Sequence, residues 1–557
     1  MRVLFKEQAN LSFAQKCSRL AHRMRDREWR RYGALLVTGK LMGVALVLAI
    51  MAAVSIVPSL LSGTAHAQTT APAAAAFDPT TVINPLNTLW VMVAAFLVFG
   101  MQAGFTMLEA GFCRSRETVN VLVECVFDTC LCGILFYACG FAFMFGHGNG
   151  FIGWGGLNAD NTITPWWFLK GAPGTYETTG VSFLAFWVFQ FAFADCASTI
   201  CSGTMIGRTN FWGDILYSVC VSGFIYPIIG HWAWGPDGFL YTMGSPDHFL
   251  SSLGMNFHDF AGSTVVHSIG GWIALAGGIV LGPRLGRKFK KDGGGPMLPH
   301  DLVMGVIGGF ILWFGWYGFN PGSTLSAMDL EGCGRVAANT TLAACAAGMT
   351  SIFFVYMRTG KWDAGAITNG FLAGLVAITC PCYWVSPTGA VALGGIAGVI
   401  VIVAADVLEF LRIDDPIGAW PVHGVCGIWG TWSLGLFASG QFNSTGSTGP
   451  TAITEATPAL TGLFYGGGIT VLKAQVIGNG IIVIATFAVA MAVFGVLNIM
   501  GLLRVSKEGE IEGLDLHEHG ISAYPEYVLS PSAAPSGMPA ELVNAGSALH
   551  TSSVMAH

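Results

Sequence analysis

Charge is scarce in this chain. Only 10% of its 557 residues are Asp, Glu, Lys or Arg, whereas soluble domains carry about 25%. Hydrophobic residues make up 53%, and the mean hydropathy is +0.60. This composition excludes an ordinary soluble protein. The chain also lacks the clustered basic residues of a nucleic-acid-binding surface, so we expect no nucleic-acid partner. The apolar composition predicts a protein embedded in a membrane.

The sequence has little that indicates a metal or cofactor. Cys130 and Cys132 form a Cys-x-Cys pair, as do Cys380 and Cys382. Two residues apart on a helix, side chains point about 200° away from each other, so such a pair cannot share one ion. We interpret these cysteines as small buried hydrophobic residues. A haem held by two histidines would need repeated His pairs within spans, which the sequence lacks. We expect no metal, no cofactor and no enzymatic activity.

The N-terminus has the pattern of a targeting segment. Residues 1–40 contain ten Lys or Arg, an apolar run covers 41–61, and Ala65-His66-Ala67 follows. Together they predict a signal peptide over residues 1–67 with a long basic region, and a short periplasmic N-terminus over 68–86. The apolar run is almost long enough to span a membrane. An uncleaved anchor and a wrongly assigned start codon therefore stay open as alternatives.

Apolar stretches of about 20 residues fill the rest of the chain, and each is long enough to cross a bilayer as a helix. They define a transmembrane domain over 87–504, which a tail at 505–527 and a polar extension at 528–557 follow. The extension is rich in Ser, Ala, Pro and Gly, a composition typical of disorder. We place eleven spans, at 88–111, 119–145, 181–206, 213–234, 262–282, 302–320, 336–357, 364–384, 389–410, 419–439 and 475–503.

Basic residues orient these spans. Loops after odd-numbered spans contain thirteen Lys or Arg, whereas the loops on the other side contain three. Cytoplasmic loops are enriched in Lys and Arg, so the mature N-terminus is expected outside and the C-terminus in the cytoplasm. The pattern predicts an all-α polytopic membrane protein in which two five-helix repeats of inverted orientation precede one extra helix.

Two segments about 150 residues apart share a pattern that we call the Asp–His segments. Asp259 precedes His267 by eight positions, and Asp415 precedes His423 by eight. Ionisable groups in membrane helices are costly and mark substrate or proton pathways, and paired helices in two repeats suggest a site between them. A lone histidine on an apolar helix is more often a satisfied core residue, but two at matching positions favour a site. These segments point to transport.

Aromatic residues cluster at the predicted outer ends of three spans, in 189–193, 232–234 and 316–319. Interfacial Trp and Tyr commonly anchor a protein in the headgroup region. The alternative is a cation site, because a desolvated aromatic face attracts ammonium-type ions by about 2 kcal/mol. Ser323 could add a hydrogen-bond acceptor there. Asp259 is expected to cap a helix or orient its neighbours.

Three motifs resemble those of the ammonium transporter (Amt/Rh) family, in its bacterial Amt branch. They are Trp313-Phe-Gly-Trp-Tyr-Gly-Phe-Asn-Pro-Gly-Ser323, Asp259-Phe-Ala-Gly-Ser-Thr-Val-Val-His267 and Asp414-Asp-Pro with Val-His-Gly-Val-Cys-Gly427. The tail Glu512-Gly-Leu-Asp-Leu-His-Glu-His-Gly520 is similar to that family's cytoplasmic end. The resemblance covers about residues 80–527. It implies a homotrimer of eleven-span protomers, each with its own pore, in the bacterial inner membrane.

The resemblance also implies roles for particular residues. Trp234, Phe193 and Ser323 would bind ammonium at an outer recruitment site, and Asp259 would support that site from behind. Phe193 and Phe319 would form a gate below it. The pore lining would then consist of Trp316, Phe189 and the twin histidines His267 and His423. Ammonium would lose a proton near the gate, and ammonia would cross an apolar channel that sodium and potassium cannot use.

Some positions depart from the family pattern. Asp195 stands where a small residue is expected, and Gly418 stands where relatives often carry Asp. Glu124 and Asp128 lie one helical turn apart in the second span, and Glu109 lies late in the first. A polar subunit interface or a cytoplasmic vestibule is the favoured interpretation of these acids, ahead of a proton route.

Two classes of function fit the sequence: a transporter, and an ammonium sensor or receptor that moves little of the ion. Sensor relatives usually append a signalling domain, and no such domain is recognisable after Arg504 in this sequence. The tail further suggests a PII-type trimeric signalling protein as a partner at the cytoplasmic face. The alternative is a tail that only holds protomers together.

Overall fold

The structure is a computed structural model that describes residues 78–154, 175–176, 179–443 and 458–524. The expected signal peptide and the extension at 528–557 lie outside the described residues. The first part of the described chain consists of helices α3 (Thr80–Phe99), α4 (Met101–Phe112), α5 (Thr118–Leu135), α6 (Phe141–Phe145), α7 (Phe183–Ser202), α8 (Phe211–Cys220), α9 (Tyr226–Trp234) and α10 (Ile269–Leu281), with π-helical turns η2 (Phe136–Gly140), η4 (Val221–Ile225) and η6 (Ser263–Ser268).

The second part contains another series of helices and a short tail. It consists of α11 (Leu302–Phe319), α12 (Leu330–Thr359), α13 (Ala364–Thr379), α14 (Pro387–Leu411), the π-helix η9 (Trp420–Val425), α15 (Cys426–Phe437), α16 (Thr470–Ile499), α17 (Lys507–Glu512) and α18 (Leu514–His519). Two small antiparallel hairpins complete it, β1 (Gly148–Asn149) with β2 (Ile152–Gly153) and β3 (Ser439–Asn443) with β4 (Ala459–Thr461).

Within the described residues, nine helical segments are long and apolar enough to cross a membrane. The all-helical, multi-span architecture predicted from the sequence is thus confirmed. The other two expected spans, 364–384 and 419–439, coincide with α13, which has only 16 residues, and with η9 followed by α15. The first span differs in its start, because α3 begins at Thr80 rather than near 88.

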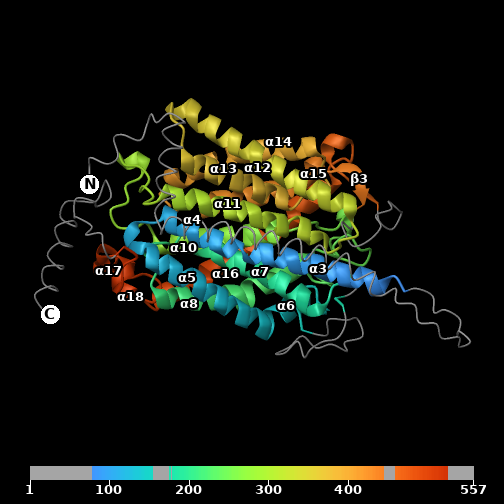
Figure 1. Cartoon of the computed structure of the whole chain (residues 1–557), viewed down its shortest axis with the longest axis horizontal. Helices are drawn as coiled ribbons and strands as arrows, with labels where there is room; N and C mark the ends of the chain where they lie inside the picture. Colours follow the sequence, from blue (N-terminus) through green and yellow to red (C-terminus); the bar gives the residue numbers. More distant parts are fainter. Residues whose placement is uncertain (1–77, 155–174, 177–178, 444–457, 525–557) are drawn as a thin grey trace, which may run out of the picture. The chain divides into compact units, whose positions relative to one another are not determined.

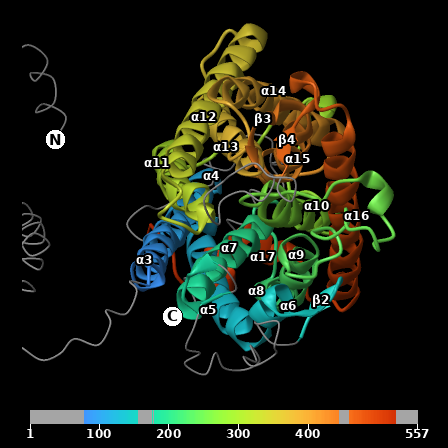
Figure 2. The same ribbon diagram turned by 90° about the vertical axis from the view of Figure 1, so that its right-hand side faces the viewer.

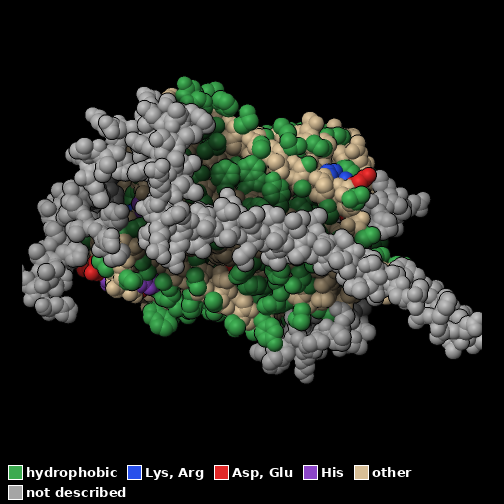
Figure 3. Space-filling model, viewed as in Figure 1, with side chains coloured by type: hydrophobic (Ala, Val, Ile, Leu, Met, Phe, Trp, Pro, Cys, Tyr) green, Lys and Arg blue, Asp and Glu red, His purple; other side chains and the backbone are tan. Residues whose placement is uncertain are grey.

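The long helices run side by side between two ends (Figure 1). Helix α12 packs against α13 and α14, α11 against α4, and α10 against α16. Seen along the helices, α12 to α15 gather on one side and α5 to α9 on the other (Figure 2). The visible face of the described residues shows many hydrophobic and very few charged side chains, as a lipid-facing surface requires (Figure 3).

Helices α17 and α18 pack at one end, which we call the tail end, beside the start of α5. Asp515 accepts a hydrogen bond from the backbone N–H of Asn120 at 3.0 Å, and His519 Nε2 lies 2.9 Å from Asn120 Oδ1. A carboxylate at a helix N-terminus satisfies an N–H that has no partner within the helix. The described part of the tail is therefore bound to the transmembrane domain.

The cysteines only partly follow the sequence interpretation. Cys132 is buried, as are Cys380 and Cys382, but Cys130 is exposed. The opposite directions of Cys130 and Cys132 on α5 agree with helix geometry, so the expectation of burial was wrong for Cys130. Among the described residues, no group of three or more His, Cys, Asp or Glu is placed to hold a metal ion.

Candidate functional site

In each Asp–His segment, the backbone folds around the carboxylate of the aspartate. Gly262 has a φ of 112°, a left-handed conformation that glycine adopts without strain, and it starts the turn into η6. His267 lies in η6, whose π-helical winding leaves backbone N–H groups available at its start. The Asp259 carboxylate accepts hydrogen bonds from the backbone N–H groups of Thr264 and Val265 within η6, each at 2.9 Å, and of Gly262 just before it at 3.1 Å.

The second segment repeats this construction. Gly418 has a φ of 82°, three residues after Asp415, as Gly262 stands three residues after Asp259. The turn leads into η9, which carries His423. The Asp415 carboxylate accepts from the backbone N–H groups of Gly418 at 2.9 Å, Ala419 at 3.1 Å and Trp420 at 3.0 Å. Glycine at position 418 therefore meets a conformational need of this turn.

The two helices that follow run antiparallel and cross closely. Arg284, just beyond the end of α10, contacts Asp414, just before the start of η9. At the crossing a side chain at Gly271 would collide with the backbone of Gly424, so only glycine permits this approach. The Nδ1 atoms of His267 and His423 lie 3.2 Å apart as a result.

The two histidine rings are buried together. His267 is fully buried and His423 is 6% exposed, and their ring centroids lie 5.2 Å apart at an interplanar angle of 29°. Within the described residues, Nε2 of His267 has no hydrogen-bond partner. Two facing imidazoles that share one Nδ1–Nδ1 hydrogen bond can pass a small polar molecule between them or relay a proton.

A column of aromatic rings leads to the histidines. Trp234 lies edge to face against Phe193 with ring centroids 6.1 Å apart, and Phe193 stacks on Phe319 at 4.0 Å. Phe319 lies 5.5 Å from His267, and Trp316 stacks on the same histidine at 5.1 Å. Phe193, Phe319 and Trp316 are almost entirely buried. The residues expected at the gate and the pore wall therefore lie together.

The remaining predicted residues surround the far end of this column. Phe189 lies 4.7 Å from Phe193 and is buried. The Trp234 indole donates a hydrogen bond to the backbone carbonyl of Asp259 at 2.7 Å. The Ser323 hydroxyl donates to the Phe319 carbonyl at 2.8 Å, which leaves its oxygen lone pairs able to accept. All nine predicted residues belong to one connected region.

The structure adds one ring that sequence reasoning missed. Phe105 of α4 lies 6.3 Å from His423, ring centroid to ring centroid, on the other side of the histidine pair. It is buried. A phenylalanine inside an apolar helix carries no local signal of such a position, so only the packing of α4 against the histidine segments reveals it.

The unusual acids are buried inside a single chain. Asp195 is fully enclosed, and Glu109, Glu124 and Asp128 are at most 4% exposed. Ser202 donates to Glu109 at 3.1 Å, and Asn120 donates to Glu124 at 2.8 Å. The favoured interpretation, a polar subunit interface or a vestibule, is wrong, because both would place these side chains at the surface of the protomer.

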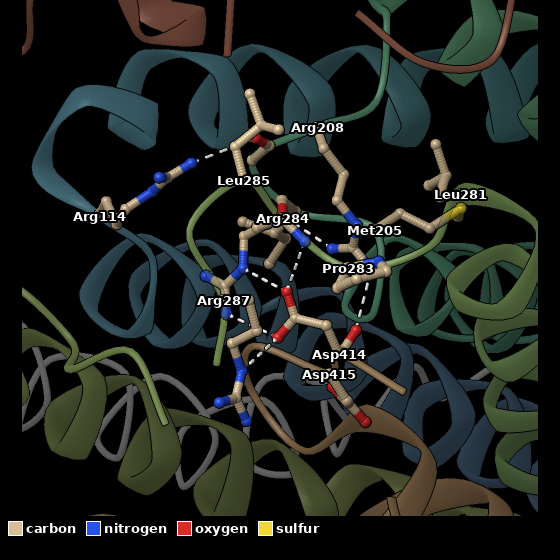
Figure 4. Close-up of polar contacts among 12 residues, drawn as sticks. Arg114, Met205, Arg208, Leu281, Pro283, Arg284, Leu285, Arg287, Asp414 and Asp415 are labelled. Carbon is tan, nitrogen blue, oxygen red and sulfur yellow. Dashed lines mark hydrogen bonds and ion pairs between the residues drawn. The ribbon is translucent and has the colours of Figure 1, made fainter. Parts of the chain in front are cut away.

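Asp414 is the centre of an ionic network at the tail end (Figure 4). Arg284 donates to both carboxylate oxygens at 2.8 and 3.0 Å, Arg287 donates at 3.2 Å, and Arg208 donates to the Asp414 carbonyl at 2.9 Å. Burial alone would raise the pKa of Asp414, but the charges of Arg284 and Arg208 outweigh it and hold that pKa well below its usual range. Burial lowers the pKa of Arg208 to about 10.

The fold is that of a polytopic helical membrane protein, with a buried aromatic column and a pair of histidines inside it. Residues 89–524 match the family model described as Ammonium Transporter Family. The chain belongs to the ammonium transporter family.

Relatives of known sequence and structure agree. The ammonium transporter Amt2 of Archaeoglobus fulgidus is 42% identical over 458 residues, which cover 82% of this chain and 91% of the relative. A putative ammonium transporter of Synechocystis is 38% identical over 83% of this chain and 93% of its own length. Among solved structures, one titled "Sensor Amt Protein" has a TM-score of 0.67 and 36% identity, covering 79% of this chain and 99% of its own. Mep2 of Saccharomyces cerevisiae has a TM-score of 0.65 and 27% identity, covering 77% of this chain and 90% of its own.

Proposed function

We propose that this protein transports ammonium by recruiting the cation at the Trp234 end of the column and conducting ammonia past the paired histidines. The observation that carries the proposal is the unbroken series of rings from Trp234 through Phe193 and Phe319 to His267 and His423. The family and the curated relatives, which are named ammonium transporters, support the substrate.

Recruitment uses the aromatic faces and the serine oxygen. Trp234 and Phe193 offer π-faces to a small cation, an attraction of about 2 kcal/mol once water is removed. Ser323 accepts a hydrogen bond from one N–H of ammonium. Asp259 holds the turn in place through three backbone hydrogen bonds and supports Trp234 through its carbonyl, so it acts without touching the ion.

Passage requires the loss of a charge. Phe193 and Phe319, stacked at 4.0 Å, close the path to hydrated ions. Ammonium gives one proton to water on the recruitment side and becomes ammonia, which crosses the apolar region without the cost of burying an ion. Potassium has no proton to give and faces a desolvation cost of several kcal/mol. The buried histidine pair then provides donor and acceptor atoms to the neutral molecule.

The assembly we propose follows the family resemblance. Helices α13 and η9–α15 count as spans, which gives eleven spans in two inverted five-helix halves plus α16. Three protomers form a homotrimer in the bacterial inner membrane, with the recruitment end and the mature N-terminus outside. The tail end then faces the cytoplasm, in keeping with its bound arginines and with α17 and α18.

A flux assay tests the proposal. Purified protein in proteoliposomes receives an ammonium gradient or an equal potassium gradient, and internal pH and current are recorded. Ammonium is expected to give a pH change or current that potassium does not give, and Asp259→Ala is expected to remove it. Equal responses to both ions would contradict the proposed selectivity.

A sensor is the second candidate, since one similar solved structure is titled "Sensor Amt Protein". A sensor would bind ammonium with little flux. Binding measured by calorimetry together with an absent ammonium-dependent signal in proteoliposomes would favour it. Uptake that restores growth of an ammonium-uptake-deficient cell would exclude it.

The tail leads to a separate proposal about a partner. We propose that a PII-type signalling protein binds the tail end and covers the cytoplasmic openings. A pull-down with the cognate PII protein is expected to succeed with the full chain and fail after deletion of residues 505–527. If the PII protein still binds after that deletion, the tail is left with the role of holding protomers together.

A further inference from the structure

Two buried amide side chains of α16 reach into the first Asp–His segment. Gln475 and Asn479 lie four residues apart on one face of the helix, and their exposed fractions are 0% and 1%. Helix α16 packs against α10 and α15, the helices that follow the two Asp–His segments (Figure 2). Sequence reasoning assigned these amides no role, because a single polar residue in an apolar helix carries no pattern. A buried amide is costly unless it is hydrogen-bonded, so its partners indicate what it does.

Gln475 binds the backbone of the residue that precedes Asp259. Its Oε1 accepts from the His258 N–H at 2.9 Å, and its Nε2 donates to the His258 carbonyl at 2.5 Å. One amide therefore satisfies both backbone groups of one residue. The chain continues directly into Asp259, whose carbonyl accepts from the Trp234 indole at 2.7 Å. Gln475 thus supports, from the side of α16, the point to which Trp234 is bound.

Asn479 starts a chain of hydrogen bonds between α16, η6 and α15. Its Nδ2 donates to the Thr264 hydroxyl at 2.9 Å, and that oxygen lies 2.5 Å from the Thr431 hydroxyl. Thr431 in turn donates to the Gly427 carbonyl at 3.0 Å. A carbonyl only accepts, so each hydroxyl donates towards Gly427 and accepts from the side of Asn479. The chain therefore has one direction, and the amide of Asn479 supplies its first donor.

The two linked threonines belong to the helices that carry the paired histidines. Thr264 lies in η6, three residues before His267, and Thr431 lies in α15, eight residues after His423. Gln475 adds a second link, because its Nε2 also lies 3.3 Å from the Thr431 carbonyl. The two amides of α16 therefore hold the first Asp–His segment against the helix that follows the second one.

The corresponding positions of the second Asp–His segment carry different residues. Trp420 stands five residues after its aspartate, where the first segment has Thr264, and the Trp420 indole N–H has no hydrogen-bond partner among the described residues. Asp414 stands where the first segment has His258, and it binds arginines rather than an amide. The contacts of Gln475 and Asn479 are thus specific to the segment next to the aromatic column.

We propose that Gln475 and Asn479 are positioning residues with separate tasks: Gln475 fixes the recruitment end, and Asn479 fixes the register of the paired histidines. Loss of Gln475 frees the backbone of His258, so the turn that binds Trp234 is no longer held in place. Loss of Asn479 loosens η6 against α15. The inference rests on the proposed transport function for its effects on substrate, whereas the contacts themselves can be tested without transport.

Hydrogen–deuterium exchange of the protein in lipid nanodiscs tests the contact of Gln475. Gln475→Met keeps the size of the side chain but removes the acceptor of the His258 N–H. Peptides over 256–268 are expected to exchange about tenfold faster in this variant. Peptides over 412–425 are expected to exchange as in the wild type. Unchanged exchange over 256–268 would overturn the proposal, whether or not the protein transports ammonium.

Uptake of radiolabelled methylammonium separates the two tasks. In Gln475→Met, KM is expected to rise about tenfold with little change in maximal rate, because a smaller fraction of the protein holds Trp234 ready to bind the cation. Gln475→Asn is one methylene too short to reach His258, so it should give the same rise and serves as a second variant. In Asn479→Leu, maximal rate is expected to fall about fivefold with KM unchanged. The same pattern in the Gln475 and Asn479 variants would refute the separate tasks.

A double variant tests whether Asn479 acts through the chain of hydroxyls. Thr264→Val keeps the shape of the side chain and interrupts the chain in its middle. Asn479→Leu added to Thr264→Val is therefore expected to lower the maximal rate little further than Thr264→Val alone. Losses that multiply would contradict the action of Asn479 through Thr264.

Thr486 provides a matched control on the same helix. It is fully buried, and its hydroxyl has no hydrogen-bond partner among the described residues. Thr486→Val is expected to change neither exchange nor uptake. Effects as large as those of the amide variants would assign them to any polar loss from α16 and overturn the proposal. Absence of uptake in the wild type would contradict the transport proposal, and the exchange result would still decide the contact of Gln475.

Discussion

The two Asp–His segments are built alike but supported differently. In both, a carboxylate binds three backbone N–H groups, a left-handed glycine follows three residues later, and a π-helical turn presents the histidine. Asp259 lies beside aromatic residues, with Trp234 bonded to its carbonyl. Asp415 instead follows Asp414, which binds arginines. The shared part positions a histidine, and the flanks place aromatic residues beside the first copy and arginines beside the second.

The largest effect is expected from removing the carboxylate of the first segment. Asp259→Ala should lower methylammonium uptake by about 100-fold or more, since each lost hydrogen bond to a charged group costs about 1.5–3 kcal/mol. Asp415→Ala should lower it by only about tenfold, because no recruitment residue depends on Asp415. Uptake by both variants in intact cells, corrected for protein in the membrane, checks the difference. Equal losses would remove the functional distinction between the segments.

The next effect concerns stability at the tail end. Asp414→Asn leaves Arg284 buried without its charged partner and should lower the free energy of unfolding by about 3 kcal/mol or more. Denaturation in detergent measures it. Folding depresses the pKa of Asp414. The stabilisation by its carboxylate is therefore fully present above the pKa of an Asp in the unfolded chain, about 3.9, and is lost as pH falls below that value. A stability that already falls between pH 7 and 5 in the wild type alone would contradict this.

The two glycine turns give a smaller effect. Gly262→Ala and Gly418→Ala each force a left-handed alanine, at a cost of about 1–2 kcal/mol. Gly262→Ala should also disturb recruitment, because its new methyl group meets Trp234, whereas at Gly418 the nearest neighbour is Asn369. Thermal unfolding should therefore change similarly in both variants, and KM for methylammonium should rise in Gly262→Ala alone. A raised KM in Gly418→Ala would contradict the difference.

The smallest effect is expected at the surface of the tail end. Asp292 pairs with Arg412 at 2.7 Å, but both side chains are exposed, at 39% and 55%. Asp292→Asn should change the free energy of unfolding by less than about 1 kcal/mol. Measured beside Asp414→Asn, it shows how much burial contributes to the strength of an ion pair. A loss as large as that of Asp414→Asn would show that the ionic network stabilises the fold through net charge rather than through burial.

Sequence alone predicted the features that depend on pattern. The matched spacing of Asp259 to His267 and Asp415 to His423 predicted that the histidines come together, and their Nδ1 atoms lie 3.2 Å apart. Apolar length predicted the multi-span helical fold. These inferences succeed because a chain that crosses lipid must form long apolar helices. A polar residue in such a helix is costly, so it commonly has a functional role.

Features that depend on packing between distant segments were beyond sequence reasoning. The π-helical winding of η6 and η9 is not revealed by any local propensity. The burial of Asp195 depends on helices that surround it from elsewhere in the chain. The tail-end network joins Arg208, Arg284 and Asp414, which lie about 70–200 residues apart in the sequence. The distribution of Lys and Arg along the chain predicts only on which side of the membrane these residues lie.

The single hydrogen bond between the two histidines gives the pair a polarity. One ring must carry its proton on Nδ1 and the other must accept there, so two neutral rings hold opposite tautomers. The pair therefore presents an N–H at one outer nitrogen and a lone pair at the other. A guest on one side meets a donor while a guest on the other side meets an acceptor. Reversal of the central bond exchanges these two ends, so the position of one hydrogen atom decides which outer nitrogen donates and which accepts.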